Sequence, residues 1–125
     1  MKRREIKQGD IYICNLDDNS VESEQCGIRP VLVLSVDILN KNRKNVIVAP
    51  ITSSLSKKNM INHYQLSSEA YTELVCKNNI VLLECLRDVS KTRLDKRVCR
   101  LKENDLSGVL DLVTYDFREF DFNLK

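Results

Sequence analysis

The chain has 125 residues, of which 42% are hydrophobic and 30% are charged, with only three glycines and two prolines. This length is typical of one hydrophobic core, so we expect a single domain over residues 1–125. The composition excludes collagen-like, disordered and low-complexity proteins. Because the sequence contains neither a membrane-length apolar run nor a signal-peptide pattern at its start, we expect a soluble, cytoplasmic protein with no membrane partner.

The net charge of +2 is unevenly distributed along the chain. Residues 1–102 carry 18 basic and 12 acidic side chains, whereas residues 103–125 carry 2 basic and 6 acidic ones. The strongest local excess lies in residues 87–100, which hold six basic and two acidic side chains. This distribution favours a polyanionic partner such as a nucleic acid. From charge alone, ordinary solvated surface remains the alternative.

Polar turns separate a series of short segments that are rich in apolar and β-branched residues. Segments of this kind predict β-strands. We expect strands at residues 10–16, 30–35, 45–52, 63–67, 79–89 and 97–101.

The last part of the chain has helical periodicity instead. Residues 103–117 have acidic side chains in the first turn and apolar ones at helical spacing, which predicts a C-terminal helix. Shorter helices are expected at residues 37–42 and at residues 67–74, where serines precede the segment. Consecutive strands with short connections and one packed helix predict an α+β domain. Its core would be a small, strongly curved antiparallel sheet or partly open barrel.

Few side chains suit metal or nucleophilic chemistry. The cysteines are odd in number and form no Cys-x-x-Cys pair, so we expect reduced thiols rather than disulfides or a zinc site. They are Cys14, Cys26, Cys76, Cys85 and Cys99. The only histidine is His63, which disfavours both a Cys–His nucleophile and a metal site. We therefore expect no metal and no cofactor.

An arginine and a threonine at the ends of two predicted strands remain as candidates for chemistry. Arg29 precedes Pro30, which favours an extended backbone where the second strand begins. Thr52 ends the third strand and is followed by Ser53. A planar guanidinium and a nearby hydroxyl suit a phosphate group. The alternatives are a structural salt bridge from Arg29 to Glu24 and an ordinary turn role for Thr52.

Four motifs cover nearly the whole chain in a recognisable order. They are "QGDIYICNL" (8–16), "SEQCGIRPVLVLS" (23–35), "VIVAPITSS" (46–54) and "NIVLLECLRDVSKTRL" (79–94). With these motifs the sequence resembles the MazF/PemK family of toxin endoribonucleases from type II toxin–antitoxin systems. The resemblance implies an SH3-like, partly open barrel with a C-terminal helix, the PemK/CcdB-like toxin fold.

The resemblance also implies roles for individual residues. Arg29 in "GIRPV" and Thr52 in "PITSS" match the catalytic arginine and threonine of the family. The residues that fall at substrate-contacting positions are Glu24, Gln25, Ser53 and Arg87. Lys91 and Arg93 in the basic stretch are expected to bind RNA as well.

The general base stays open at this point. Arginine is a poor base because its pKa lies above about 12. His63 has a more suitable intrinsic pKa, but its place at the beginning of a strand favours a structural role.

Two positions depart from the family pattern. Cys26 stands where a second glycine is usual, and Cys85 stands where a glutamine is common. A thiol cannot make the two-sided hydrogen bonds with which an amide reads a base edge. The resemblance therefore does not carry a cleavage sequence over to this chain.

For the reaction, the resemblance implies metal-free cleavage of single-stranded RNA by attack of the ribose 2′-hydroxyl, which leaves 2′,3′-cyclic phosphate and 5′-hydroxyl ends. It also implies a homodimer and inhibition by a cognate MazE-like antitoxin. Two alternatives share the same fold: a non-catalytic toxin that poisons DNA gyrase, and an inactive family member.

Overall fold

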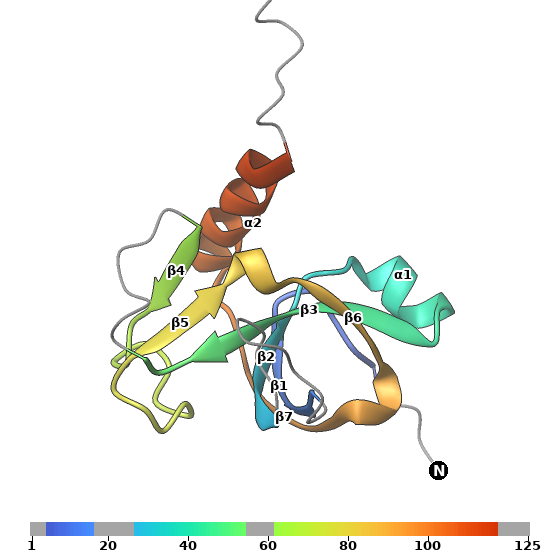
Figure 1. Ribbon diagram of the computed structural model, residues 1–125, viewed down its shortest axis with the longest axis horizontal. Coiled ribbons are helices and arrows are strands. Elements are labelled where there is room, and N and C mark those ends of the chain that lie inside the picture. The colour runs from blue at the N-terminus through green and yellow to red at the C-terminus, as the bar shows by residue number, and fades with distance from the viewer. Residues whose placement is uncertain (1–4, 17–26, 55–61, 118–125) are drawn as a thin grey trace, which may run out of the picture.

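The computed structural model describes residues 5–16, 27–54 and 62–117. Within these ranges the backbone forms seven strands, two α-helices and two 3₁₀ turns (Figure 1). The strands are β1 (Asp10–Asn15), β2 (Ile28–Val33), β3 (Asn45–Thr52), β4 (His63–Leu66), β5 (Asn79–Leu82), β6 (Arg87–Ser90) and β7 (Leu94–Arg100). The helices are α1 (Asp37–Asn42) and α2 (Glu103–Phe117), and the 3₁₀ turns are η2 (Leu83–Cys85) and η3 (Lys91–Arg93).

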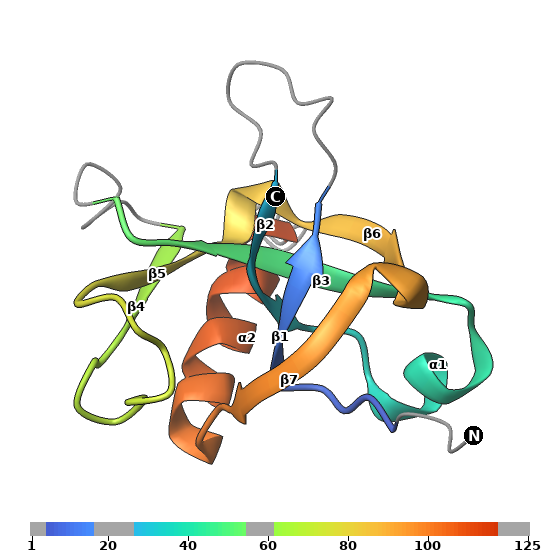
Figure 2. The same ribbon diagram turned by 90° about the horizontal axis from the view of Figure 1, so that it is seen from below.

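The strands form one antiparallel sheet in the order β4-β5-β3-β2-β1-β7, and β6 also pairs with β3. The long strand β3 is shared, because its first four residues pair with β6 and its last two pair with β5. Along β3, the register of β6 is offset by three residues from that of β5, which is the length of the intervening η2. The sheet curls into a partly open barrel whose strand order ends at β4 and β7 (Figure 2).

Alternate residues of the central strands pack into two separate hydrophobic clusters. One cluster lies between the sheet and α2 and includes Ile11, Leu32 and Val109. The other lies inside the curl of β1, β2, β3, β6 and β7 and includes Cys14 and Val31. Because a slip of one residue would exchange the two sets of side chains, burial on both faces fixes the strand register.

Hydrogen bonds and close packing anchor α2 to β4 and to the turn that follows it. The hydroxyl of Tyr64 donates to Oδ1 of Asp105 at 2.7 Å, and the hydroxyl of Tyr71 donates to Oδ2 of the same carboxylate. Burial and the Asp105 carboxylate raise the pKa of both tyrosines to about 12. The ring of Tyr64 also lies directly against Gly108 of α2. The first turns of α2 are therefore fixed over the sheet.

Much of the predicted architecture is confirmed. The C-terminal helix spans residues 103–117 as expected, and the short helix spans residues 37–42. The strands predicted at 10–16, 45–52 and 63–67 agree with β1, β3 and β4 to within one residue. None of the helices in the described part of the chain is long and apolar enough to cross a membrane.

Two elements were predicted wrongly. The apolar run at 79–89 is not one strand, because η2 divides it into β5 and β6. Residues 67–74 form turns rather than a helix. The Ser67 hydroxyl does accept hydrogen bonds from the backbone N–H groups of Glu69 and Ala70, but the chain does not continue as a helix beyond this turn.

The boundaries of two strands also shifted. β2 begins at Ile28, two residues before the predicted start at Pro30, and β7 begins at Leu94 rather than at Arg97. In both cases pairing with β1 extends the strand into polar sequence. Arg29 is consequently inside a strand, not just before one.

Candidate active site

The backbone of Arg29 is held by its pairing with β1. Arg29 is the second residue of β2, is half-buried and lies opposite Cys14. Immediately before the strand, Gly27 adopts a positive φ of 77°, a conformation that favours glycine. The carbonyl of Gly27 accepts a 2.8 Å hydrogen bond from the N–H of Leu16. The guanidinium of Arg29 therefore extends from a backbone that is fixed on both sides of the β1–β2 connection.

Thr52 lies on the neighbouring strand. It is the last residue of β3, is 8% exposed, and its Oγ1 accepts a hydrogen bond from the N–H of Ser54 at 3.3 Å. The register of β2 on β3 pairs Val31 with Pro50. Continued by two residues, this register places Arg29 and Thr52 on the same face of the sheet, at the ends where the two strands separate (Figure 2).

Two more arginines approach the end of β1. The positive charges of Arg87 and Arg93 both lower the pKa of the Cys14 thiol, although burial is the larger effect and raises that pKa overall. Arg87 is the first residue of β6 and lies opposite Val48. Arg29 is the cross-strand neighbour of the same cysteine. Three arginines, from β2, β6 and η3, are therefore placed near Cys14 at one end of the barrel, and such a concentration of positive charge suits a phosphodiester backbone.

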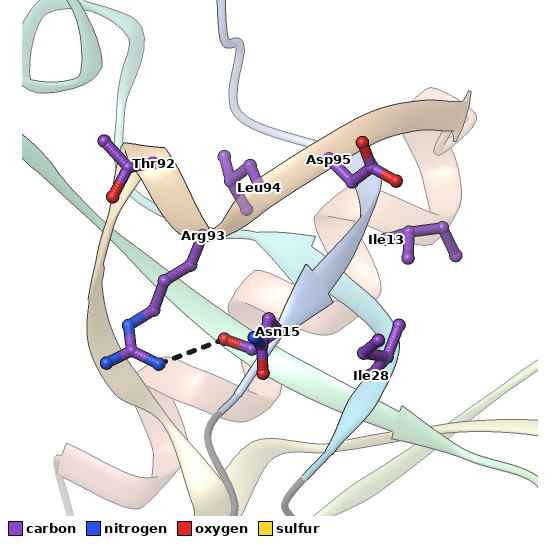
Figure 3. Close-up of a pocket in the computed structure, with 7 residues that line it drawn as sticks. All are labelled: Ile13, Asn15, Ile28, Thr92, Arg93, Leu94 and Asp95. Carbon is purple, nitrogen blue, oxygen red and sulfur yellow. Dashed lines mark hydrogen bonds between the residues drawn. The ribbon is translucent and has the colours of Figure 1, made fainter.

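A hollow of about 570 Å³ opens at the rim of the barrel beside these arginines (Figure 3). We call it the rim groove. It is lined by Ile13, Asn15, Ile28, Thr92, Arg93, Leu94 and Asp95. The guanidinium of Arg93 donates a 3.2 Å hydrogen bond to the carbonyl of Asn15, which ties η3 to the end of β1. Because Ile28 and Asn15 alternate with Arg29 and Cys14 along their strands, their side chains face the other side of the sheet.

The sequence-predicted residues are distributed as follows. Arg29 lies at the beginning of β2, and Thr52 with the adjoining Ser53 lies at the end of β3, where the two strands separate. Arg87 and Arg93 lie near Cys14 at the end of β1. Lys91 begins η3, two residues before Arg93, and its N–H donates to the carbonyl of Lys44, which precedes the beginning of β3. Glu24, Gln25 and Cys26 lie outside the described residues.

His63 is held in a local pair. Its side chain is 1% exposed, and its Nε2 lies 2.5 Å from Oε1 of Glu84 in η2. This contact joins the beginning of β4 to the turn after β5. In the described ranges, no three His, Cys, Asp or Glu side chains are grouped so that they could hold a metal ion.

Sequence reasoning missed most of the rim groove. Ile13, Asn15, Ile28 and Asp95 were not singled out, because each is an ordinary strand residue in the sequence. One signal was available. Ile28 is three positions before Val31 in the same strand, so its side chain lies on the opposite face from that of Val31, which is buried in the barrel interior. Its side chain is 75% exposed in the structure. A single exposed apolar residue is common, but Ile28 lines the groove together with Ile13, and contiguous apolar surface marks a binding site more often.

Comparison with known proteins places the chain in a family. Residues 7–115 match the model for the PemK-like, MazF-like toxin of type II toxin–antitoxin systems. The chain is 32% identical to endoribonuclease EndoA of Bacillus subtilis over 94% of its own length and 98% of the relative's. It is 34% identical to endoribonuclease MazF of Staphylococcus epidermidis, over 83% and 84% of the two chains.

The fold is also found in solved structures. A crystal structure of MazE–MazF from Deinococcus radiodurans matches with a TM-score of 0.72 and 20% identity, over 95% of this chain and 100% of that one. The small curled sheet with its C-terminal helix is thus the fold of a MazF-like toxin. The chain belongs to the PemK-like, MazF-like toxin family of type II toxin–antitoxin systems.

Proposed function

We propose that this protein is a sequence-specific, metal-independent endoribonuclease that cleaves single-stranded RNA. The observation that carries the proposal is the placement of Arg29 and Thr52 on one face, at the separating ends of β2 and β3. Arg87 and Arg93 approach the same end of the barrel. Family membership and the names of the endoribonuclease relatives support the same activity.

The reaction requires three things of the protein: it must hold the phosphate, stabilise the extra negative charge of the phosphorane, and allow proton transfer at both oxygens. The Arg29 guanidinium carries a fixed charge and planar donors that suit the equatorial oxygens. The Thr52 hydroxyl supplies one further donor on the same face. Arg87 and Arg93 are proposed to hold the neighbouring phosphates, and Ser53, Glu24, Gln25 and Lys91 to contact the substrate.

The nucleophile is proposed to come from the substrate itself. The ribose 2′-hydroxyl adjacent to the scissile phosphate is already held near the phosphorus atom, so its attack is effectively intramolecular. The 2′-oxygen loses its proton as it forms a bond to phosphorus, the P–O bond to the departing 5′-oxygen breaks, and the 5′-oxygen takes up a proton. The products are a 2′,3′-cyclic phosphate and a 5′-hydroxyl end. This route needs no metal-activated water.

The identity of the general base is left open by the geometry. His63 is nearly fully buried and is paired with Glu84, so we assign it a structural role. Arginine itself is an unfavourable base because its pKa lies above about 12.

The toxin is proposed to act as a homodimer and to be inhibited by a cognate MazE-like antitoxin. The MazE–MazF crystal structure from Deinococcus radiodurans supports an antitoxin partner, because it holds a toxin of this fold together with its antitoxin. The cationic end of the barrel gives an acidic antitoxin segment a surface that attracts it.

An RNA with one 2′-deoxynucleotide immediately upstream of the scissile phosphate tests the mechanism. The all-RNA control should be cut in excess EDTA and give cyclic phosphate ends, whereas the modified strand should bind and remain whole. Efficient cleavage of the modified strand, or loss of activity in EDTA, would refute the mechanism. If no RNA is cut under any condition, the endoribonuclease assignment itself is wrong.

A further inference from the structure

Apart from Arg93, the residues that line the rim groove have no part in the reaction described above. Ile28 immediately precedes Arg29 in β2, and Arg93 both lines the groove and approaches the end of β1 beside Cys14. In Figure 3, Asp95, Ile13 and Ile28 lie along one side, and Arg93 with Asn15 lies on the other. Because Ile28 and Asn15 are the chain neighbours of Arg29 and Cys14, the groove opens at the same strand ends, on the opposite side of the sheet. An RNA held at Arg29 must therefore pass over these strand ends to enter the groove.

The size and lining of the groove suit a planar base. Its volume of about 570 Å³ falls within the range of small-molecule sites, which is roughly 300–1,000 Å³. Ile13, Ile28 and Leu94 supply an apolar surface, and Ile28 is 75% exposed. The side chains of Asn15, Asp95 and Thr92 supply hydrogen-bonding groups around that surface. A flat, partly apolar ligand with a polar edge satisfies both requirements.

Asp95 gives the groove a chemical preference. It is exposed, and in the described ranges its carboxylate has no hydrogen-bond or ion-pair partner. A carboxylate accepts hydrogen bonds only, and it can accept two in parallel. Guanine presents two adjacent donors, N1–H and the N2 amino group. Adenine and cytosine place one amino group beside an acceptor nitrogen, and uracil places one N–H between two carbonyls. In each of these three bases, the acceptor beside the donor repels the second oxygen of a carboxylate.

We propose that the rim groove binds a guanine base of the RNA close to the scissile phosphate, and that Asp95 selects this base. The inference rests on the endoribonuclease function proposed above and adds a specificity-determining residue to it. A base is favoured over an acidic antitoxin segment as the occupant, because the Asp95 carboxylate attracts the amino edge of guanine and repels acidic side chains.

Sequencing the 5′ ends of fragments from a pool with randomised positions tests the proposal. The parent protein should favour guanine at one fixed position near the cut. Asp95→Asn should lower cleavage of guanine sites relative to other sites by about 10-fold or more, the discrimination of one bidentate pair, and shift the preference toward adenine. The matched control is Asp88→Asn, which alters an exposed aspartate of β6 that accepts from Asn45 at 2.8 Å, and it should keep the parent pattern.

A binding measurement separates this proposal from cleavage. With the Arg29→Ala variant and a fluorescent RNA, replacing the guanine by inosine removes the N2 amino group and should weaken binding several-fold. In the Asp95→Asn, Arg29→Ala double variant the same replacement should have no effect. A parent that cuts RNA without any guanine preference, or equal binding of the two RNAs by Arg29→Ala, overturns the guanine assignment. If Ile28→Ala leaves the cleavage pattern intact but weakens antitoxin binding or dimerisation, the groove holds protein and the proposal is wrong.

Discussion

Replacing Gly108 by alanine tests how closely α2 is held against β4. An added Cβ would lie 2.8 Å from Cε2 of Tyr64 and 3.0 Å from its hydroxyl oxygen. The ring cannot turn away without losing the 2.7 Å hydrogen bond to Asp105. Overpacking costs about 1–3 kcal/mol, and a hydrogen bond to a charged group contributes about 1.5–3 kcal/mol. Alanine recovers about 1 kcal/mol in helix propensity, so we expect a net destabilisation of roughly 2 kcal/mol.

Urea unfolding followed by circular dichroism measures this change. In a Tyr64→Ala background the steric conflict is absent, so Gly108→Ala should instead stabilise the protein by up to about 1 kcal/mol. The neighbouring Ser107→Ala, at an exposed position of α2, serves as the control and should change stability by no more than about 0.5 kcal/mol. If Gly108→Ala stabilises the parent protein, Tyr64 is not fixed by Asp105 and the reasoning fails.

Two further predictions concern the site and the pH dependence. Arg29→Ala should lower the single-turnover rate of RNA cleavage by about 10²-fold or more, the usual effect of losing one preorganised donor, with an unchanged circular dichroism spectrum. A rate within about threefold of the parent would remove Arg29 from the chemistry, and Arg43→Ala, at an exposed arginine after α1, is the control. Because the pKa values of Tyr64 and Tyr71 are raised from 10 to about 12 in the folded protein, their contribution to stability is complete below pH 10 and is lost as the pH rises to 12. The midpoint of urea unfolding, measured from pH 8 to 12, should fall less steeply with pH for Tyr64→Phe than for the parent. Equal slopes of midpoint against pH for the two proteins would contradict this.

The helix α2 could be predicted from the sequence because its pattern depends on local spacing alone. Apolar residues at 3.6-residue intervals and acidic residues in the first turn are sufficient for this. The division of the run 79–89 could not be predicted in this way. It arises because β5 and β6 pair with different parts of β3 in registers that differ by three residues. Such an offset is a tertiary property, and Leu83 and Cys85 of η2 continue the apolar run of β5 in the sequence.

The candidate site shows the same contrast. Arg29 and Thr52 were identified from motifs, since both lie next to recognisable strand sequences. Asp95 and Ile28 were not, because the groove that they line forms only when β7 and η3 close against the end of β1. The proximity of Arg87 and Arg93 to Cys14 likewise requires the barrel to form. β6 is placed by its pairing with β3, and η3 is tied to the end of β1 by the hydrogen bond from Arg93 to Asn15.

Two prolines help to explain why the site opens where it does. Pro30 follows Arg29 in β2, and Pro50 lies two residues before Thr52 in β3. Proline has no backbone N–H, so neither residue can donate a hydrogen bond to a neighbouring strand. The pairs between β2 and β3 end at Val31 and Pro50, and beyond this point Ile51 and Thr52 pair with β5 on the other side. The separation of the two strands therefore leaves Arg29 and Thr52 beyond the last β2–β3 pair, which is where we propose that the scissile phosphate binds.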